Sequence, residues 1–547
     1  MSLLSRMLSA ALQLPPAQTR DLVIERNLAV PMPDGTVLRA DRYAPRGSTG
    51  LPVVLIRSPY GRRGIMAEMW ARPFAERGYQ ALIQSVRGTF GSAGRFDPHH
   101  HERADGLATL EWIKQQPWFG DAIFTFGQSY LGYVQWAIAR DAGPELKAMA
   151  TQITTSHFAN MTYAGGSFSL RNALGWSRLV THQERLIAPL LAFRELGAMG
   201  DPLRAVWRKL PPLATADGLA AGRRVSFFQD WLKYASPDDP WWRPIDFQRT
   251  LAEVDRPVCM VAGWDDIFTP WQLQDFTIMQ DAGRDVRLVV GPWKHLDPPV
   301  NSFGLREALA FFHAQLSGDR SALRELPVRV YVTGQNAFRD FARWPPAEAR
   351  AERFYLQPRA ALSPQPAAAS EPDSYTYNPN DPTPAIGGPT LALDLARVDN
   401  RVLEARRDVL KYTSGPLPRD LDVIGPISAE LYVSSDRATC DFFVRLCDVD
   451  PAGVSTNICD GLARVRFPEL PASSDGAQRI EVKLWPTAHR FHKGHRLRVQ
   501  VSSGAYPRWA INPGTIAPLA QTTPRLPQRQ NIHHSPTHPS AIVLSVV

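Results

Sequence analysis

Short apolar runs alternate with stretches of helical apolar spacing over the first 156 residues of the chain. The strand-like runs lie at 52–56, 80–84 and 123–125, and the helical stretches lie at 66–77 and 104–116. Such alternation is typical of a parallel sheet with helices on both faces. A hairpin is predicted before it at residues 22–43, because Pro33-Asp34-Gly35 forms a turn sequence between alternating apolar residues.

The strand pattern stops between residues 157 and 248. Segments 181–195 and 201–210 have helical apolar spacing, and the region is rich in Trp and Phe. We interpret it as a helical cap inserted into the sheet domain, with most of its aromatic side chains in the core of the cap.

Strand-like runs return at 257–262 and 286–290, with helical stretches near 271–281 and 305–316. Beyond residue 327 the pattern changes again to alternating apolar and polar positions, which is typical of an antiparallel sandwich or jelly roll. These runs lie at 427–433, 441–446, 479–484 and 496–501. The sequence therefore predicts an α/β domain (1–156 and 249–326), a cap (157–248) and a C-terminal jelly-roll domain (327–547).

Composition and charge argue against several classes of protein. The apolar content of 44% is that of a globular protein, and no apolar stretch approaches the roughly 20 residues that cross a membrane. The N-terminus is a poor secretory signal, so we expect a cytoplasmic protein. The formal charge is +8, but the basic residues are scattered among 53 acids, which argues against a nucleic-acid partner. The four cysteines lack metal-ligand spacing and are predicted to be buried thiols.

Three predicted strands are each followed by a residue type that hydrolases use in catalysis. Ser129 lies in Gly127-Gln128-Ser129-Tyr130-Leu131-Gly132, between a strand and a helix, where α/β hydrolases carry their nucleophile. Asp266 and His295 follow the next two strands, and the order serine, acid, histidine is that of the same class. Taken alone, Asp266 could cap the helix near 271–281 and His295 could be an ordinary loop residue. The second glycine of the usual G-x-S-x-G pattern is replaced by Leu131.

Several further motifs make the chain resemble the cocaine-esterase-like (CocE/NonD) hydrolases, relatives of X-Pro dipeptidyl-peptidases and α-amino-acid ester hydrolases. The G-x-S-Y-x-G form around Ser129 is this family's own variant. The likeness extends to the C-terminal segments 431–436 and 441–450. The other matching motifs are Arg57-Ser58-Pro59-Tyr60, Arg87-Gly88-Thr89-Phe90-Gly91-Ser92-Ala93-Gly94, Gly263-Trp264-Asp265-Asp266 and Gly291-Pro292-Trp293-Lys294-His295.

The resemblance implies a role for each site residue. Ser129 is implied as nucleophile, His295 as general base and then acid, and Asp266 as the group that orients His295. The oxyanion hole is implied to consist of the Tyr130 backbone N–H and the Tyr60 hydroxyl. No cofactor is implied.

Two positions depart from the family. Ser85 stands where the family usually has Asp, which we expect to alter how Arg87 is held. Lys294 stands where the family tends to have a small residue, and its charge either lowers the pKa of His295 or points into solvent.

Substrate preference follows from other positions. Phe268 and Thr269 replace the acids with which α-amino-acid ester hydrolases hold a substrate ammonium group, and Trp176 matches an aromatic pocket wall. The prediction is therefore an ester with an apolar or aromatic acyl group, held by Phe268 and Trp176. An X-Pro peptidase or related amidase is the second hypothesis, and a non-catalytic ligand-binding protein is the third. The sequence predicts no oligomeric state.

Two groups of histidines, His99-His100-His101 and His533-His534, lack a supporting array of Cys or carboxylates. We interpret them as solvated loop residues rather than metal ligands.

Overall fold

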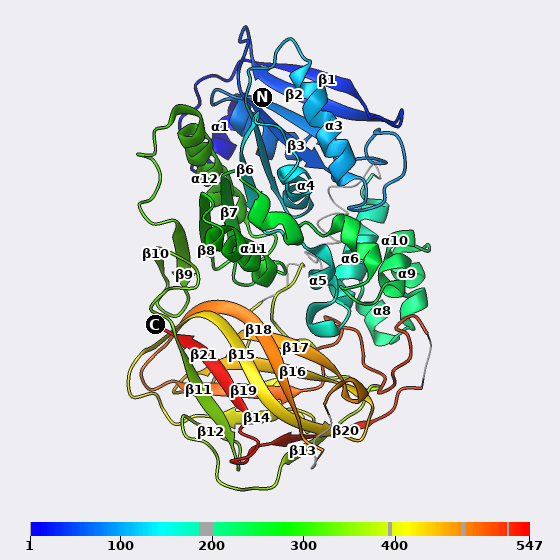
Figure 1. Cartoon of the computed structure of the whole chain (residues 1–547), viewed down its shortest axis with the longest axis vertical. Coiled ribbons are helices and arrows are strands. Elements are labelled where there is room, and N and C mark those ends of the chain that lie inside the picture. Colours follow the sequence, from blue (N-terminus) through cyan, green and yellow to red (C-terminus); the bar gives the residue numbers. More distant parts are fainter. Residues whose placement is uncertain (1, 185–200, 392–395, 472–475, 522–523) are drawn as a thin grey trace. The chain divides into compact units, whose positions relative to one another are not determined.

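The computed structural model describes residues 2–184, 201–391, 396–471, 476–521 and 524–547 (Figure 1). The chain forms two compact units. The first comprises Met1–Phe158, His182–Ala188 and Trp241–Arg329, and the second comprises Ala159–Thr181, Pro189–Pro240 and Val330–Val547. Much of the segment predicted as a cap thus belongs to the same unit as the C-terminal β domain.

The first unit is built on a largely parallel sheet with the strand order β1-β2-β4-β3-β5-β6-β7-β8. Its strands are β1 (Leu22–Pro31), β2 (Val37–Pro45), β3 (Val53–Ser58), β4 (Gln80–Ser85), β5 (Ile123–Gln128), β6 (Leu146–Gln152), β7 (Val258–Gly263) and β8 (Val286–Gly291). Strands β3 to β8 are parallel, while β1 and β2 form the predicted antiparallel hairpin at one edge. The predicted α/β class is confirmed, although β6 was not predicted.

Helices cover both faces of this sheet. On one face, Phe124 of β5 packs on Phe312 of α12 (Pro298–Ser317), with ring centroids 4.5 Å apart. On the other face, the Thr125 hydroxyl donates to Gln135 of α4 (Tyr130–Ala139) at 2.8 Å. Neighbouring residues of one strand therefore contact helices on opposite sides, as strand geometry requires.

The helices predicted for this unit are found, together with some that were not predicted. The stretch predicted at 66–77 divides into a π-helical turn, Ala67–Ala71, and α2, Arg72–Ala75. Pro73 lies at this junction and cannot donate a backbone hydrogen bond to the preceding turn. The other predicted helices are α3 (Glu102–Lys114) and α11 (Thr269–Asp281), while α1 (Ser2–Ala11) and the short helices Pro240–Ile245 and Gln248–Glu253 were not predicted.

The helical part of the second unit packs around aromatic side chains. Its helices are α5 (Phe158–Thr162), Ala164–Gly166, α6 (Leu170–His182), α8 (Arg204–Arg208), α9 (Leu213–Ala221) and α10 (Ser226–Lys233). Trp231 is 1% exposed and stacks on Trp176, with ring centroids 5.9 Å apart. The helix predicted at 201–210 corresponds to α8, while the one predicted at 181–195 falls mostly outside the described residues.

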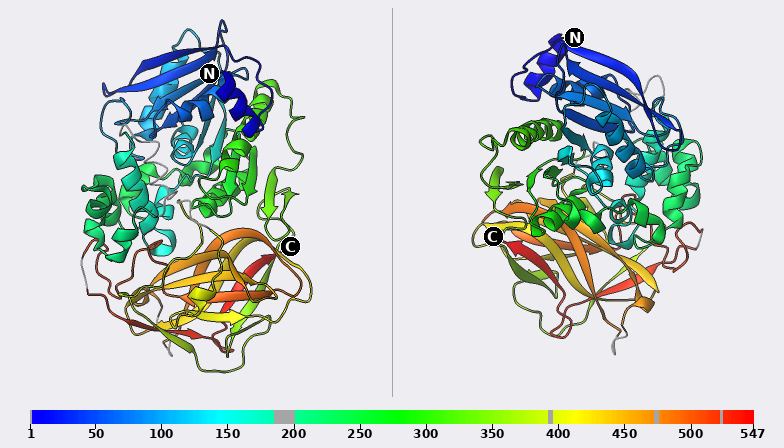
Figure 2. Two further views of the ribbon diagram at one scale, coloured as in Figure 1. Left: turned by 180° about the vertical axis from the view of Figure 1, so that it is seen from behind. Right: turned by 45° about the horizontal axis from the view of Figure 1, so that its top comes forward.

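The rest of the second unit is a β domain, whose long strands gather together in the yellow-to-red part of the chain (Figure 2). The four predicted strands correspond to β15, β16, β18 and β19. Pairing is almost entirely antiparallel, and the jelly-roll topology stays a prediction. The strands are β11 (Arg350–Gln357), β12 (Ala361–Ser363), β13 (Asp373–Tyr377), β14 (Leu410–Thr413), β15 (Leu421–Ser435), β16 (Thr439–Val449), β17 (Ser455–Arg466), β18 (Gln478–Phe491), β19 (Arg496–Ser502), β20 (Gln528–His533) and β21 (Ala541–Val546). The chain enters this unit through β9 (Val328–Val332) and β10 (Ala337–Phe341), and the short helices α13 (Arg401–Glu404) and Phe467–Glu469 complete it.

Burial of the cysteines is confirmed. Cys259, Cys440, Cys447 and Cys459 are all buried and unpaired, and burial raises the pKa of the Cys447 thiol to about 12. Across the described ranges, every helix is too short or too polar to cross a bilayer.

Candidate active site

Ser129 occupies a strained turn between β5 and α4. Its backbone angles, φ 55° and ψ −122°, lie outside the regions that a side chain ordinarily allows. A Cβ atom on Gly127 would lie 2.4 Å from the Leu131 Cβ, and one on Gly132 would lie 2.6 Å from the Thr154 Cγ2. The glycine at 132 rather than 131 thus has a physical reason, since Leu131 covers Gly127 while Gly132 lets the first turn of α4 approach Thr154.

Asp266 and His295 reach this turn from the carboxyl ends of β7 and β8. His295 Nε2 lies 3.0 Å from Ser129 Oγ, and His295 Nδ1 lies 2.5 Å from Asp266 Oδ2. Asp266 Oδ1 accepts the backbone N–H of Phe268 at 2.7 Å. His295 is 4% exposed and Asp266 is fully buried. The structure therefore brings the hydroxyl, the imidazole and the carboxylate into one hydrogen-bonded line.

Trp293 fixes the loop that carries His295. A Cβ atom on Gly263 would lie 2.3 Å from the Trp293 carbonyl oxygen, and one on Gly291 would lie 2.3 Å from the indole ring. Trp293 is 5% exposed. Both motif glycines therefore make room for the Trp293 residue that packs over the ends of β7 and β8.

Comparison with known proteins agrees with this geometry. Residues 34–297 match the X-Pro dipeptidyl-peptidase (S15) family, and residues 322–543 match the X-Pro dipeptidyl-peptidase C-terminal non-catalytic domain. The chain is 32% identical over 571 residues to cocaine esterase of Rhodococcus sp. (strain MB1 Bresler), and this covers 96% of the chain and 98% of the relative. The chain belongs to the cocaine-esterase-like hydrolases of the S15 family. It is a serine hydrolase.

Solved structures share the fold over the whole chain. An aminopeptidase of the marine-sediment archaeon Thaumarchaeota archaeon superposes with a TM-score of 0.81 at 22% identity, covering 97% of this chain and 98% of that one. An α-amino-acid ester hydrolase gives the same TM-score and identity, covering 98% of each chain. At these identities the likeness concerns the fold alone.

In this cocaine-esterase-like hydrolase, a buried hydrogen-bond network connects the turn at Ser129 to the segment after β6 and to α11. The Thr154 hydroxyl donates to the Ser129 carbonyl oxygen at 2.7 Å. Two residues later, the backbone N–H and hydroxyl of Ser156 donate to Asp275 of α11 at 2.8 and 2.7 Å, and the Gln248 amide adds a third hydrogen bond at 2.9 Å. Burial outweighs these donors and raises the pKa of Asp275 to about 7. Sequence reasoning missed this network, because a polar residue on a predicted helix reads as solvent-facing.

The Tyr130 side chain belongs to the structural support of the turn. Its hydroxyl donates to Glu102 at 2.8 Å and accepts the His99 backbone N–H at 2.9 Å. Glu102 in turn pairs with the buried Arg57 at 2.9 Å. Burial raises the pKa of Glu102, although Arg57 opposes the shift. What Tyr130 places beside Ser129 is its backbone N–H, at the first residue of α4.

Tyr60 lies two residues beyond the end of β3. It is half-buried, and its backbone N–H donates to the Ser58 hydroxyl at 3.0 Å. Ser58 is at the carboxyl end of a parallel strand next to β5, so Tyr60 lies at the same sheet edge as Ser129.

Ser85 and Arg87 have different hydrogen-bond partners, and the expected effect of Ser85 on Arg87 stays a prediction. The Ser85 hydroxyl accepts a hydrogen bond from Arg62 at 3.0 Å, whereas Arg87 is held by Asp105 through two contacts of 3.0 and 2.6 Å and by Asp34 at 2.6 Å. Arg87 thus keeps two carboxylate partners that do not involve position 85.

Lys294 pairs with an acid in its own loop. Its ammonium group lies 3.6 Å from Asp297, whose carboxylate also accepts the Lys294 backbone N–H at 2.8 Å. The charge of Lys294 is therefore directed to Asp297.

The two residues predicted to line the acyl pocket lie in different units. Phe268 is 7% exposed and its ring centroid lies 5.6 Å from that of His295. Trp176 lies on α6 in the second unit, half-buried against Trp231 and Phe227.

The interpretation of the histidine groups as solvated loop residues is wrong for two members. His99 is 2% exposed and packs between Phe158 and Tyr133, with ring centroids 4.0 and 4.4 Å away, and burial lowers its pKa. His534 is 1% exposed and contacts Asp373 at 3.0 Å. Neither belongs to a cluster of three potential metal ligands within the part of the chain that the structure describes.

Proposed function

We propose that this protein hydrolyses carboxylic esters with an apolar or aromatic acyl group through an acyl-enzyme on Ser129. The observation that carries the proposal is the line from Ser129 Oγ through His295 to Asp266, at 3.0 and 2.5 Å. A serine hydroxyl is a weak nucleophile until an adjacent base takes its proton.

In the first half-reaction, Ser129 Oγ attacks the acyl carbon while its proton passes to His295 Nε2. Asp266 stabilises the imidazolium and holds His295 Nδ1 as the protonated nitrogen. Collapse of the tetrahedral intermediate breaks the bond to the alcohol oxygen, which leaves with the proton from Nε2. In the second half-reaction, water attacks the acyl carbon by the same route and releases the acid.

Negative charge on the carbonyl oxygen needs donors on the side away from His295. The backbone N–H of Tyr130 fits this role, because it follows the nucleophile at the N-terminus of α4. The Tyr60 hydroxyl is assigned as the second donor, on the basis of its place at the end of β3 and the family resemblance. Each such donor contributes about 3–4 kcal/mol to transition-state stabilisation.

The acyl preference is inferred from Phe268 and Trp176. Phe268 packs beside His295, and the next residue, Thr269, is fully buried with its hydroxyl directed to the Gly263 carbonyl. Neither position offers a carboxylate for a substrate ammonium group. A relative at 32% identity is named cocaine esterase, which supports an ester over an X-Pro amide.

Labelling with a fluorophosphonate probe tests the nucleophile. We expect covalent labelling of the folded protein that is lost in Ser129→Ala. A matched control is Ser370→Ala, since Ser370 also contacts a histidine, His534, that in turn contacts Asp373. The Ser370 hydroxyl also donates a hydrogen bond to the His534 carbonyl oxygen at 2.9 Å, so we do not expect it to act as a nucleophile. The Ser370→Ala variant should therefore be labelled as the unaltered protein is. Folded protein that resists the probe would favour a binding role.

The substrate class is tested by comparing kcat/KM for an aryl ester with that for an X-Pro anilide. We expect the ester to be preferred. A clear preference for the anilide would instead establish a peptidase.

A further inference from the structure

The loop that carries Tyr60 is tied to the rest of the first unit by a buried arginine. Arg62 lies two residues after Tyr60, in the same loop beyond β3, and is 6% exposed. Four of its five N–H groups donate to acceptors on β1, on β2, at the end of β4 and in the loop after β4. The acceptors are Asn27 Oδ1 (2.6 Å), Asp41 Oδ1 (3.0 Å), Ser85 Oγ (3.0 Å) and the Phe90 carbonyl oxygen (2.5 Å).

The charge of Arg62 is balanced by Asp41, which is fully buried on β2. Burial by itself raises the pKa of Asp41, but hydrogen bonds from Arg63, the Asn27 backbone N–H and Arg62 together lower it. Asp41 is therefore ionised, and its pair with Arg62 is a charge-assisted contact inside the protein. Loss of either partner would leave a buried charge unpaired, so Arg62 is held in one position.

The backbone on either side of Tyr60 is also fixed. The Gln183 side-chain amide donates to the Pro59 carbonyl oxygen at 2.9 Å. Gly61 has φ +96°, and a Cβ atom there would lie 3.2 Å from the ring of Phe90, whose carbonyl oxygen accepts the Arg62 N–H. The Arg87–Gly94 motif thus contacts the Tyr60 loop through both the ring and the backbone of Phe90.

We propose that Arg62 is a positioning residue for ester hydrolysis, which fixes the loop so that the Tyr60 hydroxyl lies beside the carbonyl oxygen of the bound ester. This role rests on the proposed function, in which the Tyr60 hydroxyl is the second oxyanion donor. Such a donor is effective only when it is in place before the negative charge develops. A displacement of about 1 Å can cost about 10²-fold in rate, so the hold of Arg62 on the loop should be visible in kcat.

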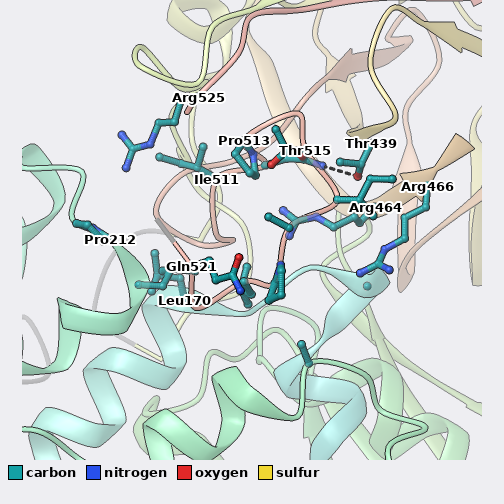
Figure 3. A pocket seen from close by; sticks show the side chains of 18 of the residues that line it. Leu170, Pro212, Thr439, Arg464, Arg466, Ile511, Pro513, Thr515, Gln521 and Arg525 are labelled. Carbon is teal, nitrogen blue, oxygen red and sulfur yellow. Dashed lines mark hydrogen bonds between the residues drawn. The ribbon is translucent and has the colours of Figure 1, made fainter. Parts of the chain in front are cut away.

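A similar arginine occurs in the second unit, whereas the three triad residues belong to the first. Figure 3 shows Arg464 among the residues that line a pocket of the second unit. Arg464 donates to Asp441 through two contacts of 2.8 Å and to the Ala510 carbonyl oxygen at 3.0 Å, at the start of the loop 511–519. It therefore joins a carboxylate to a loop carbonyl as Arg62 does, and provides a control for the structural effect of losing a guanidinium.

Steady-state kinetics on 4-nitrophenyl benzoate, an aryl ester, test the proposal with Arg62→Lys, Tyr60→Phe and the double variant. Lysine keeps the charge but cannot reproduce the planar fork that reaches four acceptors. We expect Arg62→Lys to lower kcat by about tenfold, with KM changed by less than about twofold. The double variant should have the kcat of Tyr60→Phe alone, because the placement of a hydroxyl that is absent no longer matters.

Two variants serve as controls. Arg63 is the next residue and contacts the same carboxylate, Asp41, at 2.8 Å, but its side chain is 45% exposed. Arg63→Lys should keep the kcat of the unaltered protein. Arg464→Lys should lower the melting temperature and leave kcat unchanged in assays well below that temperature.

Ser85→Ala carries the test if Arg62→Lys does not fold. It removes one acceptor of Arg62 and leaves the pair with Asp41, so kcat should fall by about threefold, and should not fall further in a Tyr60→Phe background. An unchanged kcat in the folded variant, or an equal fall with and without the Tyr60 hydroxyl, would overturn the role of Arg62. Labelling of Ser129 and ester turnover would then persist, whereas failure of the proposed function would abolish both.

Discussion

Asp275 makes the stability of the first unit dependent on pH. Its carboxyl group is fully buried on α11, where it holds the segment after β6 that supports Ser129. Burial raises its pKa from 3.8 to about 7. The difference of about 3 units, at 1.36 kcal/mol per unit, amounts to about 4 kcal/mol.

The sign follows from proton binding. Between the unfolded and folded pKa values, about 4 and 7, the folded protein binds a proton that the unfolded chain does not. Stability therefore falls as the pH rises through this interval, and the loss is complete above about pH 7. In Asp275→Asn the side chain is neutral at every pH, so this contribution disappears.

Urea denaturation followed by tryptophan fluorescence at pH 5 and pH 8.5 measures the effect. Only the part of the interval from pH 5 to about pH 7 lies between the two pKa values, so we expect Asp275→Asn to gain about 3 kcal/mol relative to the unaltered protein. Asp285→Asn is the control, because Arg320 and Gln315 lower the pKa of Asp285 against the effect of burial. Asp285 is therefore ionised in both states at both pH values. The reasoning is refuted if the stability difference between Asp275→Asn and the unaltered protein is the same at both values.

Three further substitutions probe the site and the β domain. Tyr60→Phe should lower kcat by about 10²- to 10³-fold with little change in KM, and an unchanged kcat on an aryl ester would exclude its hydroxyl from the oxyanion hole. Thr154→Val removes the hydrogen bond to the Ser129 carbonyl, so both kcat and the melting temperature should fall. The expected loss in free energy of unfolding is about 1 kcal/mol. Thr154→Ser keeps the hydroxyl and should restore both quantities. For His534, Asp373 outweighs burial and raises the pKa. The resulting stabilisation is present below the unfolded pKa of 6.5 and is lost as the pH rises above it towards the folded pKa. We therefore expect His534→Gln to lower the free energy of unfolding most in acid. An equal loss in urea denaturation at alkaline pH would contradict this.

The site residues that sequence reasoning found are those at the ends of apolar strands. Strands β5, β7 and β8 consist almost entirely of buried residues, and their ends are marked by glycine, so the pattern placed Ser129, Asp266 and His295 at strand ends and the family resemblance supplied their expected roles. Residues that act through side-chain hydrogen bonds gave no such signal. His99 was assigned to solvent because it lies in a predicted loop without a supporting array of Cys or carboxylates, yet it is buried among aromatic rings that only the tertiary structure brings together.

Strand β6 shows why the residues that support the turn at Ser129 were harder to find than Ser129 itself. Its sequence, with Lys147 and several small residues, lacks the β-branched content that marks a buried strand. Nevertheless, the Gln152 carbonyl at its end accepts the Ser129 N–H at 2.9 Å, and Thr154 just beyond it donates to the Ser129 carbonyl. A turn at φ 55° persists only where its surroundings hold it. The strain at Ser129 is therefore balanced largely by β6 and the residues after it, and substitutions there should alter the reactivity of Ser129 without touching the substrate.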